Sequence, residues 1–360
     1  MSEIFAASRE WASRSDDQRF TSLSELRDSV ASRRQQSWTA APKVTDLRTV
    51  IDDGQLRIEV YDPTHSERRK LSPTHWGFGQ VAQYANAPAS YLRRLPVELA
   101  AINLQYGLER DNIRPDALVL AQSNGHDSLR AITSQSYGRI WDLEVVEAVQ
   151  KVNADGRWQI PAASYATSNP KRATTLYASD RDVFIFLVDP SHPIEVGGDT
   201  LFRGFYTWNS EVGAATFGLT TFLYRYVCDN RIIWGATDVK ELKIRHTGGA
   251  PERFAYEGAR YLTRYAEEST FTAVAQIKAA QDFEIPKASE KDGVSKWLRE
   301  RGFTDALAKN SVNAAVAEEG QARSLWDIVN GITAYARTIP HTDERVKVEQ
   351  QAGKLMKLVA

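Results

Sequence analysis

Residues 197–236, GGDTLFRGFYTWNSEVGAATFGLTTFLYRYVCDNRIIWGA, decide the fold of this chain. Bulky apolar residues in their first part alternate with Arg203 and Asn209, which is the pattern of a β-strand. Gly204 and Gly213 permit a bend or the close approach of another backbone. The stretch therefore predicts a strand that ends in an unusual turn and is followed by a second strand.

Asn209, Ser210 and Glu211 stand consecutively in the predicted turn. Short polar side chains bond to nearby backbone in turns, so a structural role is the first interpretation. An alternative is a cleft in which these residues join Asp199 and His246, with carboxylates that hold magnesium or act as a general base. Their spacing does not specify which of these chemistries would apply.

Composition limits the function classes. The chain has 360 residues, with 45 Lys and Arg against 46 Asp and Glu. Because the whole chain has no basic excess, any nucleic-acid partner must bind a local patch of basic residues. Cys228 is the only cysteine, and in a strand-like run it is more often a buried side chain than a nucleophile. The first residues resemble no signal peptide, and no apolar run reaches membrane-spanning length. We expect a cytoplasmic protein with no membrane partner.

The periodicities predict an α+β fold with a largely antiparallel central sheet. A capped helix beginning near Ser22 or Ser24 and a strand at 55–62 fall in an otherwise polar start. The expected segments are a polar N-terminal extension at 1–70, a helical section at 71–112, a β-rich core at 113–250 and a C-terminal helical region at 251–360, with 71–360 as one domain.

Common catalytic and cofactor motifs are missing from the sequence. It contains no GxxxxGK[ST], HExxH or GxSxG pattern. Gly77, Gly79 and Ala82 match a loose dinucleotide-binding pattern, but no convincing strand precedes them, so a helix start is the better interpretation. The six histidines lie far apart and none pairs with Cys228 at a metal-ligand spacing. We expect no cofactor and no metal.

Basic residues interleaved with aromatic ones could hold single-stranded nucleic acid, with Arg and Lys on phosphates and rings stacked on bases. The candidate phosphate contacts are Arg139, Arg203, Arg225, Arg231, Lys243 and Arg245, and the candidate stacking residues are Tyr224, Tyr226 and Trp234. The alternative is that the aromatic side chains fill the core while the charges lie in water.

The same central stretch resembles the signature of a phage- and plasmid-like family catalogued as domain of unknown function number nine hundred and thirty-two. Blocks such as YANAPASYLRRLP (84–96), SLRAITSQSYGRIWDLEVVEAV (128–149) and SLWDIVNGITAYAR (324–337) are similar to that family too, so the likeness runs from about residue 70 to the end. The resemblance implies a mobile-element setting and supplies no catalytic residue. In outline the fold is also similar to single-strand annealing recombinases, which is an analogy of fold alone.

Three hypotheses follow, in this order. The first is a DNA-binding protein of a phage or plasmid that favours single strands, anneals them in recombination or replication, and is not an enzyme. The second is an enzyme that acts on a nucleotide or phosphoester in the cleft named above. The third is an assembly or host-interaction module without nucleic-acid binding; a homo-oligomer is compatible with each.

Overall fold

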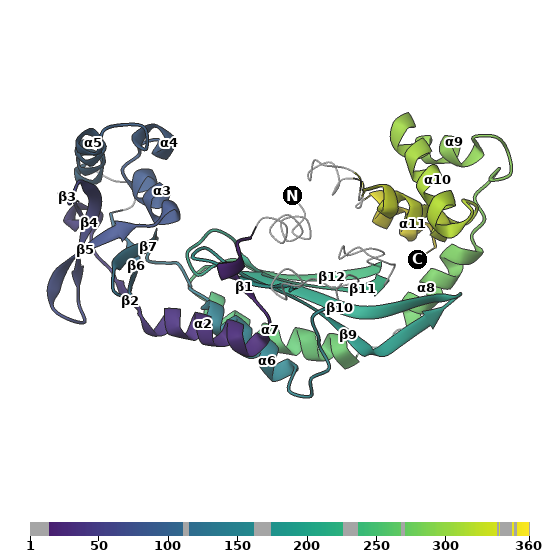
Figure 1. Cartoon of the computed structure of the whole chain (residues 1–360), viewed down its shortest axis with the longest axis horizontal. Helices are drawn as coiled ribbons and strands as arrows, with labels where there is room; N and C mark the ends of the chain where they lie inside the picture. The colour runs from purple at the N-terminus through teal and green to yellow at the C-terminus, as the bar shows by residue number, and fades with distance from the viewer. Residues whose placement is uncertain are drawn as a thin grey trace.

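Three parts lie side by side along the molecule in the computed structural model: a small lobe, a long sheet and a group of C-terminal helices (Figure 1). The structure describes residues 14–110, 115–161, 174–225, 237–267, 271–336, 338, 348 and 351–359, and at 222–225, 237–241 and 271–273 it describes the backbone alone. Helices and two six-stranded sheets confirm the predicted α+β class.

The small lobe is a six-stranded sheet with helices packed on it. Its strand order is β2-β6-β7-β5-β4-β3, antiparallel except for β5 beside β7. Ile58, Leu71, Leu104 and Val119 are fully buried in its core. The elements are β2 (Ser37–Ala40), η2 (Val44–Asp46), β3 (Arg48–Asp52), β4 (Gln55–Asp62), β5 (Glu67–Pro73), α3 (His75–Tyr84), α4 (Ala89–Leu92), α5 (Val97–Glu109), β6 (Leu118–Ser123) and β7 (Asp127–Thr133).

Residues 16–73 form helices and strands rather than a polar extension. The predicted strand at 55–62 is β4, and α2 (Leu23–Gln35) begins after Ser22, whose hydroxyl accepts a hydrogen bond from the Glu25 amide at 3.1 Å. Strands β2 to β5 pair with each other or with β6 and β7, so the sheet crosses the boundaries expected near 70 and 112. These strands read as polar because much of their surface is half-buried or exposed.

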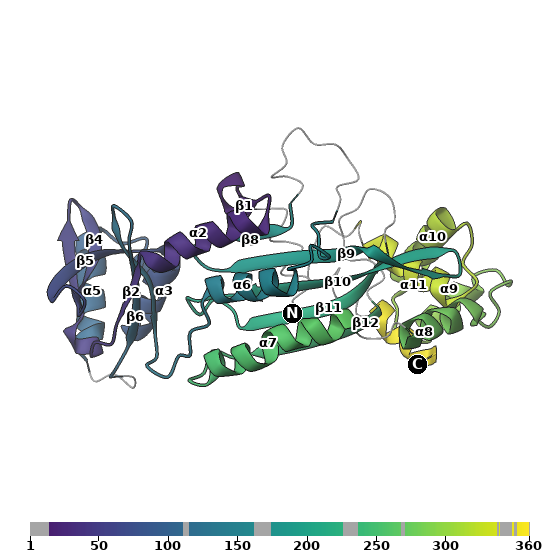
Figure 2. The same ribbon diagram turned by 90° about the horizontal axis from the view of Figure 1, so that it is seen from below.

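The long sheet has the order β1-β8-β9-β10-β11-β12 and is antiparallel throughout. Its strands are β1 (Arg19–Phe20, after the short η1 at Asp16–Gln18), β8 (Leu176–Ala178), β9 (Val183–Val196), β10 (Asp199–Asn209), β11 (Phe217–Arg225) and β12 (Thr237–Ile244). Helices α2, α6 (Asp142–Val152) and α7 (Ala250–Glu267) lie along one face (Figure 2). That face buries Leu26, Val146, Ile185, Phe205 and Phe254 in one core.

Aromatic rings form a row on the opposite face of the long sheet. The ring centroids lie 6.1 Å apart from Tyr177 to Phe184, 5.8 Å from Phe184 to Tyr206 and 5.5 Å from Tyr206 to Trp208. Each of the four side chains is exposed by 9% or less. These four aromatic side chains are therefore core residues.

The C-terminal helices pack around a third core that includes Leu298, Trp326 and Ile332, and the sheet contributes Leu201 to it. The helices are α8 (Phe271–Asp282), α9 (Gly293–Arg299), α10 (Asp305–Glu319), α11 (Leu325–Ala336) and η4 (Met356–Val359). In the described parts of the chain, no helix combines the length and apolar character needed to cross a membrane.

Candidate functional site

The turn between β10 and β11 is held by its own side chains. The Ser210 hydroxyl accepts a hydrogen bond from the Ala214 amide at 2.9 Å and donates to the Arg181 carbonyl. Gly213 has a φ of 83°, a left-handed conformation that favours glycine. The turn predicted from Asn209, Ser210 and Glu211 is thus present, bonded as its residue types suggested.

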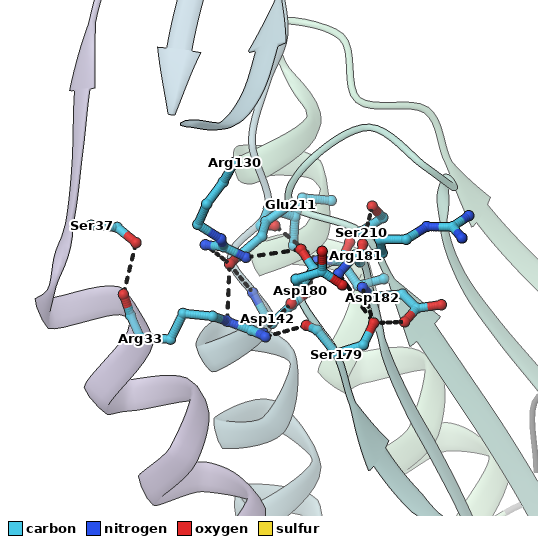
Figure 3. Close-up of polar contacts among 12 residues, drawn as sticks. Arg33, Ser37, Arg130, Asp142, Ser179, Asp180, Arg181, Asp182, Ser210 and Glu211 are labelled. Atoms are coloured by element: carbon cyan, nitrogen blue, oxygen red, sulfur yellow. Dashed lines mark hydrogen bonds and ion pairs between the residues drawn. The ribbon is translucent and has the colours of Figure 1, made fainter. Parts of the chain in front are cut away.

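A buried polar cluster surrounds this turn (Figure 3). Arg33 of α2 lies 2.7 Å from an Asp142 carboxylate oxygen, and the Asn209 amide donates to the other oxygen at 2.8 Å. Glu211 accepts from the Asp142 backbone amide at 3.2 Å and forms an ion pair with Arg130 of β7. A second contact joins Arg33 to Glu211 at 3.4 Å. Segments far apart in the sequence therefore meet at two carboxylates.

The pKa values of the two carboxyl groups in this cluster are shifted in opposite directions. Complete burial raises the pKa of Asp142 to about 8, and the negative charge of Glu211 acts in the same direction. Burial also opposes ionisation of Glu211, but the positive charges of Arg130 and Arg33 lower the pKa of that group below its usual value. Of the pair, Asp142 is therefore the carboxyl whose pKa is raised.

Arg139 and His246 complete the cluster on the side of Tyr137. The Arg139 side chain donates to the Glu211 carbonyl, and its guanidinium carbon lies 5.2 Å from the Tyr137 ring centroid. Burial lowers the pKa of Arg139 to about 10. The His246 ring stacks on Tyr137 at 5.0 Å, and burial lowers its pKa, which favours the neutral imidazole. Arg139 is thus a structural cation, and its predicted contact with phosphate is wrong in this structure.

Two further predicted site residues lie elsewhere. Asp199 begins β10 and accepts a hydrogen bond from the Trp326 indole, about 33 Å of strand away from Asn209, so it does not belong to the proposed cleft. Arg203 is only 8% exposed and donates to the carbonyls of Tyr265 at 2.8 Å and Ala266 at 2.6 Å. The Arg203 guanidinium thus satisfies carbonyl groups in the last turn of α7, and in this buried position it cannot reach a phosphate in solution.

The remaining nucleic-acid candidates are placed only in part. Lys243 and Arg245 are exposed at the end of β12. Tyr224 and Arg225 stand in β11 opposite Phe202 and Leu201, and their side chains are outside the described part of the structure. Tyr226, Arg231 and Trp234 lie outside the described residues, as does Cys228. The prediction for these positions stays open.

Sequence reasoning missed Arg33, Arg130 and Asp142, because no local pattern links three positions so far apart along the chain. It also missed a repeated tetrapeptide that was visible, Asp-Pro-Thr-His at 62–65 and Asp-Pro-Ser-His at 189–192. In both copies a fully buried aspartate pairs with the histidine three residues on, at 2.8 Å from His65 to Asp62 and 2.9 Å from His192 to Asp189. A nearby arginine binds each aspartate as well.

The polar cluster joins elements rather than opening to a ligand. Asp142, Asn209, Ser210 and Glu211 are each exposed by 2% or less, so a substrate would have to displace packed structure to reach them. Within the described ranges no three His, Cys, Asp or Glu side chains gather as a metal site would require. The arrangement connects α2, α6, β7 and the turn through two buried carboxyl groups.

The chain belongs to the family described as Domain of unknown function (DUF932), whose model matches residues 122–357. The expected family is therefore confirmed, although the match begins within β6 rather than near residue 70. No curated protein and no solved structure matches the chain. The phage or plasmid setting stays a prediction.

Proposed function

We propose that this protein binds nucleic acid, with a preference for single strands, along the edge formed by the end of β12 and the outer face of α7. We name this surface the β12–α7 edge and define it by its exposed residues. They are Lys243, Arg245, Arg253, Tyr256, Arg260 and Arg264.

One pair of side chains carries the proposal. Tyr256 is 67% exposed, which makes it one of the most exposed large rings described, and the Arg260 guanidinium lies 4.8 Å above it. An exposed aromatic ring is a surface on which a base can stack, and an arginine beside it can reach the adjoining phosphate. The aromatic row on the sheet offers no such surface, because it is buried.

The charges around this pair favour an anionic partner. Residues 242–267 contain five basic side chains against the three acidic ones Glu252, Glu257 and Glu267. Glu257 is engaged by Arg253 at 2.9 Å, which leaves Arg260 and Arg264 further along the helix. From Arg253 to Arg264 the helix rises by about 16 Å, long enough to follow several phosphates of an extended strand.

The sheet flanked by helices supports the narrower proposal that the protein anneals single strands in the replication or recombination of a phage or plasmid. That setting would place it in the cytoplasm. Lys243 and Arg245 remain proposed phosphate contacts. The arginines of α7 replace Arg139 and Arg203 in that role. No catalytic step is part of this proposal.

Fluorescence anisotropy with labelled single- and double-stranded DNA at two salt concentrations tests the proposed function. We expect binding that weakens steeply with salt, because phosphate contacts release counterions. Tyr256→Ala should weaken single-strand binding by roughly 5- to 150-fold, the effect of about 1–3 kcal/mol for one stacked base. Arg260→Ala should weaken binding to all sequences alike.

Arg94→Ala is the matched control, because Arg94 is an exposed arginine of the small lobe, away from this edge. Its affinity should equal that of the parent protein. No binding by the parent at low salt would overturn the proposed function. Binding that Tyr256→Ala and Arg260→Ala leave intact would overturn the assignment of this surface.

A further inference from the structure

Helix α5 carries a row of exposed apolar side chains on the face away from the small-lobe core. Leu99, Ile102 and Tyr106 are 48%, 64% and 65% exposed. The opposite face of the same helix buries Ala101, Leu104 and other residues. Exposed large apolar groups in a row are unusual on a helix whose buried face is already complete, and they mark an interaction surface.

We propose that this face of α5 pairs with the same face of a second copy of the chain, with the two helices antiparallel. The three residues are spaced by three and then four positions, the spacing of a two-helix seam. A two-fold axis near Ile102 would bring the two copies of Ile102 together at the centre. It would also place Leu99 of each copy beside Tyr106 of the other, so the surface is self-complementary.

The charges at the two ends of α5 favour this occupant and this orientation. Glu98 lies in the first turn of the helix. At the other end the acidic Glu109 is bound within its own chain, by Gln105 at 2.9 Å and near Arg48 at 3.9 Å, and Arg110 follows it. Antiparallel pairing brings each Glu98 toward the Arg110 of the other copy, so that both ends of the seam carry opposite charges. A parallel pairing would instead place equal charges together.

The proposed contact is small. Helix α5 has 13 residues and is about 20 Å long, so a pair of these helices buries less surface than a standard stable interface. We therefore expect a dimer that dissociates on dilution through the micromolar range. Because α5 precedes the family-matched region at 122–357, the pairing surface lies outside that region.

Sedimentation velocity of the full chain across a concentration series tests the pairing. The parent protein should pass from monomer to dimer, and Ile102→Glu should weaken dimerisation by roughly a hundredfold or more, because it buries two like charges at the centre of the seam. Tyr256→Glu is the matched control, since it introduces the same charge at an equally exposed residue of α7. It should dimerise as the parent does.

Charge exchange tests the orientation. Glu98→Arg alone and Arg110→Glu alone should each weaken dimerisation by about tenfold, because each places like charges together at both ends of the seam. The double variant carries both reversals and should recover the affinity of the parent. Circular dichroism would confirm that each variant is folded. A parent that stays monomeric, an Ile102→Glu variant that still dimerises, or a double variant that does not recover would overturn the proposal.

Discussion

Buried carboxylates in this protein are held in two opposite ways. Burial alone would raise the pKa of Asp62 and of Asp189, but hydrogen bonds from His65 to the first and from Arg157 and His192 to the second lower both values below the usual range. These aspartates stabilise the fold above about pH 4, and that contribution is lost as pH falls through their lowered pKa values. Asp142 differs, since burial raises its pKa above the usual range.

The raised pKa of Asp142 predicts a pH-dependent stability. Between about pH 4, where an unfolded aspartate ionises, and about pH 8, the folded state binds a proton that the unfolded state releases. The free energy of unfolding from this group therefore falls as pH rises through that window. Asp142→Asn cannot ionise, so its stability relative to the parent should increase from pH 5 to pH 8, as measured by urea denaturation.

The exposed carboxylate of Asp305 provides the control for this experiment. Its pKa is lowered by Lys309, so Asp305→Asn should change no slope between pH 5 and pH 8. His246 titrates in the opposite sense, but it is present in every variant and cancels in the comparison. Parallel curves for the parent and Asp142→Asn would show that Asp142 is ionised in the folded protein throughout this range.

Single residues were the hardest level to predict from the sequence. Ser210 and Glu211 were found because turns use such side chains. Ser210 does accept a bond from the Ala214 amide four residues on, whereas the Glu211 carboxylate is bound by the distant Arg130. Arg203 was assigned to phosphate because its charge suggested exposure, whereas the α7 carbonyls that bind it lie more than 60 residues away. Charge can be read from a sequence, but burial is set by partners that tertiary structure brings in.

At the scale of elements, strands β10 and β11 depend on one glycine. Gly218 lies opposite Trp208, and a Cβ atom added at Gly218 would come within 1.8 Å of the Trp208 ring. The glycine thus lets the indole lie flat across the neighbouring strand and remain stacked on Tyr206. The alternating pattern predicted both strands, but it did not reveal this pairing because register depends on the turn.

Gly218→Ala should therefore destabilise the protein by about 1–3 kcal/mol, since the rigid indole must leave its row of rings. Chemical denaturation gives the value directly. Gly249→Ala is the control, because nothing lies within 4 Å of a Cβ atom added there. In a Trp208→Leu background the same change at Gly218 should cost much less, and an equal cost in both backgrounds would contradict the explanation.

On the scale of the whole molecule, one turn joins the two sheets. Val212 is fully buried against Leu120 of β6 and Ala131 of β7 in the small lobe, although it belongs to the β10–β11 turn of the long sheet. Its carbonyl accepts hydrogen bonds from the Trp76 indole at 3.0 Å and the Gln80 amide at 2.9 Å. Helix α3 of the small lobe therefore binds the turn that also carries Glu211.

Trp76→Ala should loosen this joint while each sheet remains folded. Loss of the indole and its hydrogen bond should lower the free energy needed to separate α3 from the β10–β11 turn by roughly 2–3 kcal/mol. Cleavage by a broad-specificity protease in residues 134–138 should then accelerate about 30- to 150-fold. Trp38→Ala, a half-buried tryptophan within the small lobe that bonds Ser123 at 3.3 Å, is the control. Equal cleavage rates for the two variants would contradict a special role for Trp76.

The general architecture followed from the sequence, since periodicity and composition predicted an α+β chain whose middle is mainly sheet. The division into segments did not, because β1 pairs with β8, β2 with β6 and β5 with β7, and these partner strands are encoded much later in the chain. Helix α2 was predicted by its cap, yet nothing in its sequence showed that Arg33 would reach Asp142. Local signals identify elements, and long-range pairing decides where they go.

The pairing of β1 with β8 also constrains how the chain can fold while it is being made. The Thr174 hydroxyl donates to the Phe20 carbonyl across 154 residues of sequence. At ribosomal rates of about 5–20 residues per second, the first strand would wait roughly 8–30 s for its neighbour to be synthesised. Strand β1 must remain without its partner β8 during that interval, so this long-range pairing can form only after most of the long sheet has been synthesised.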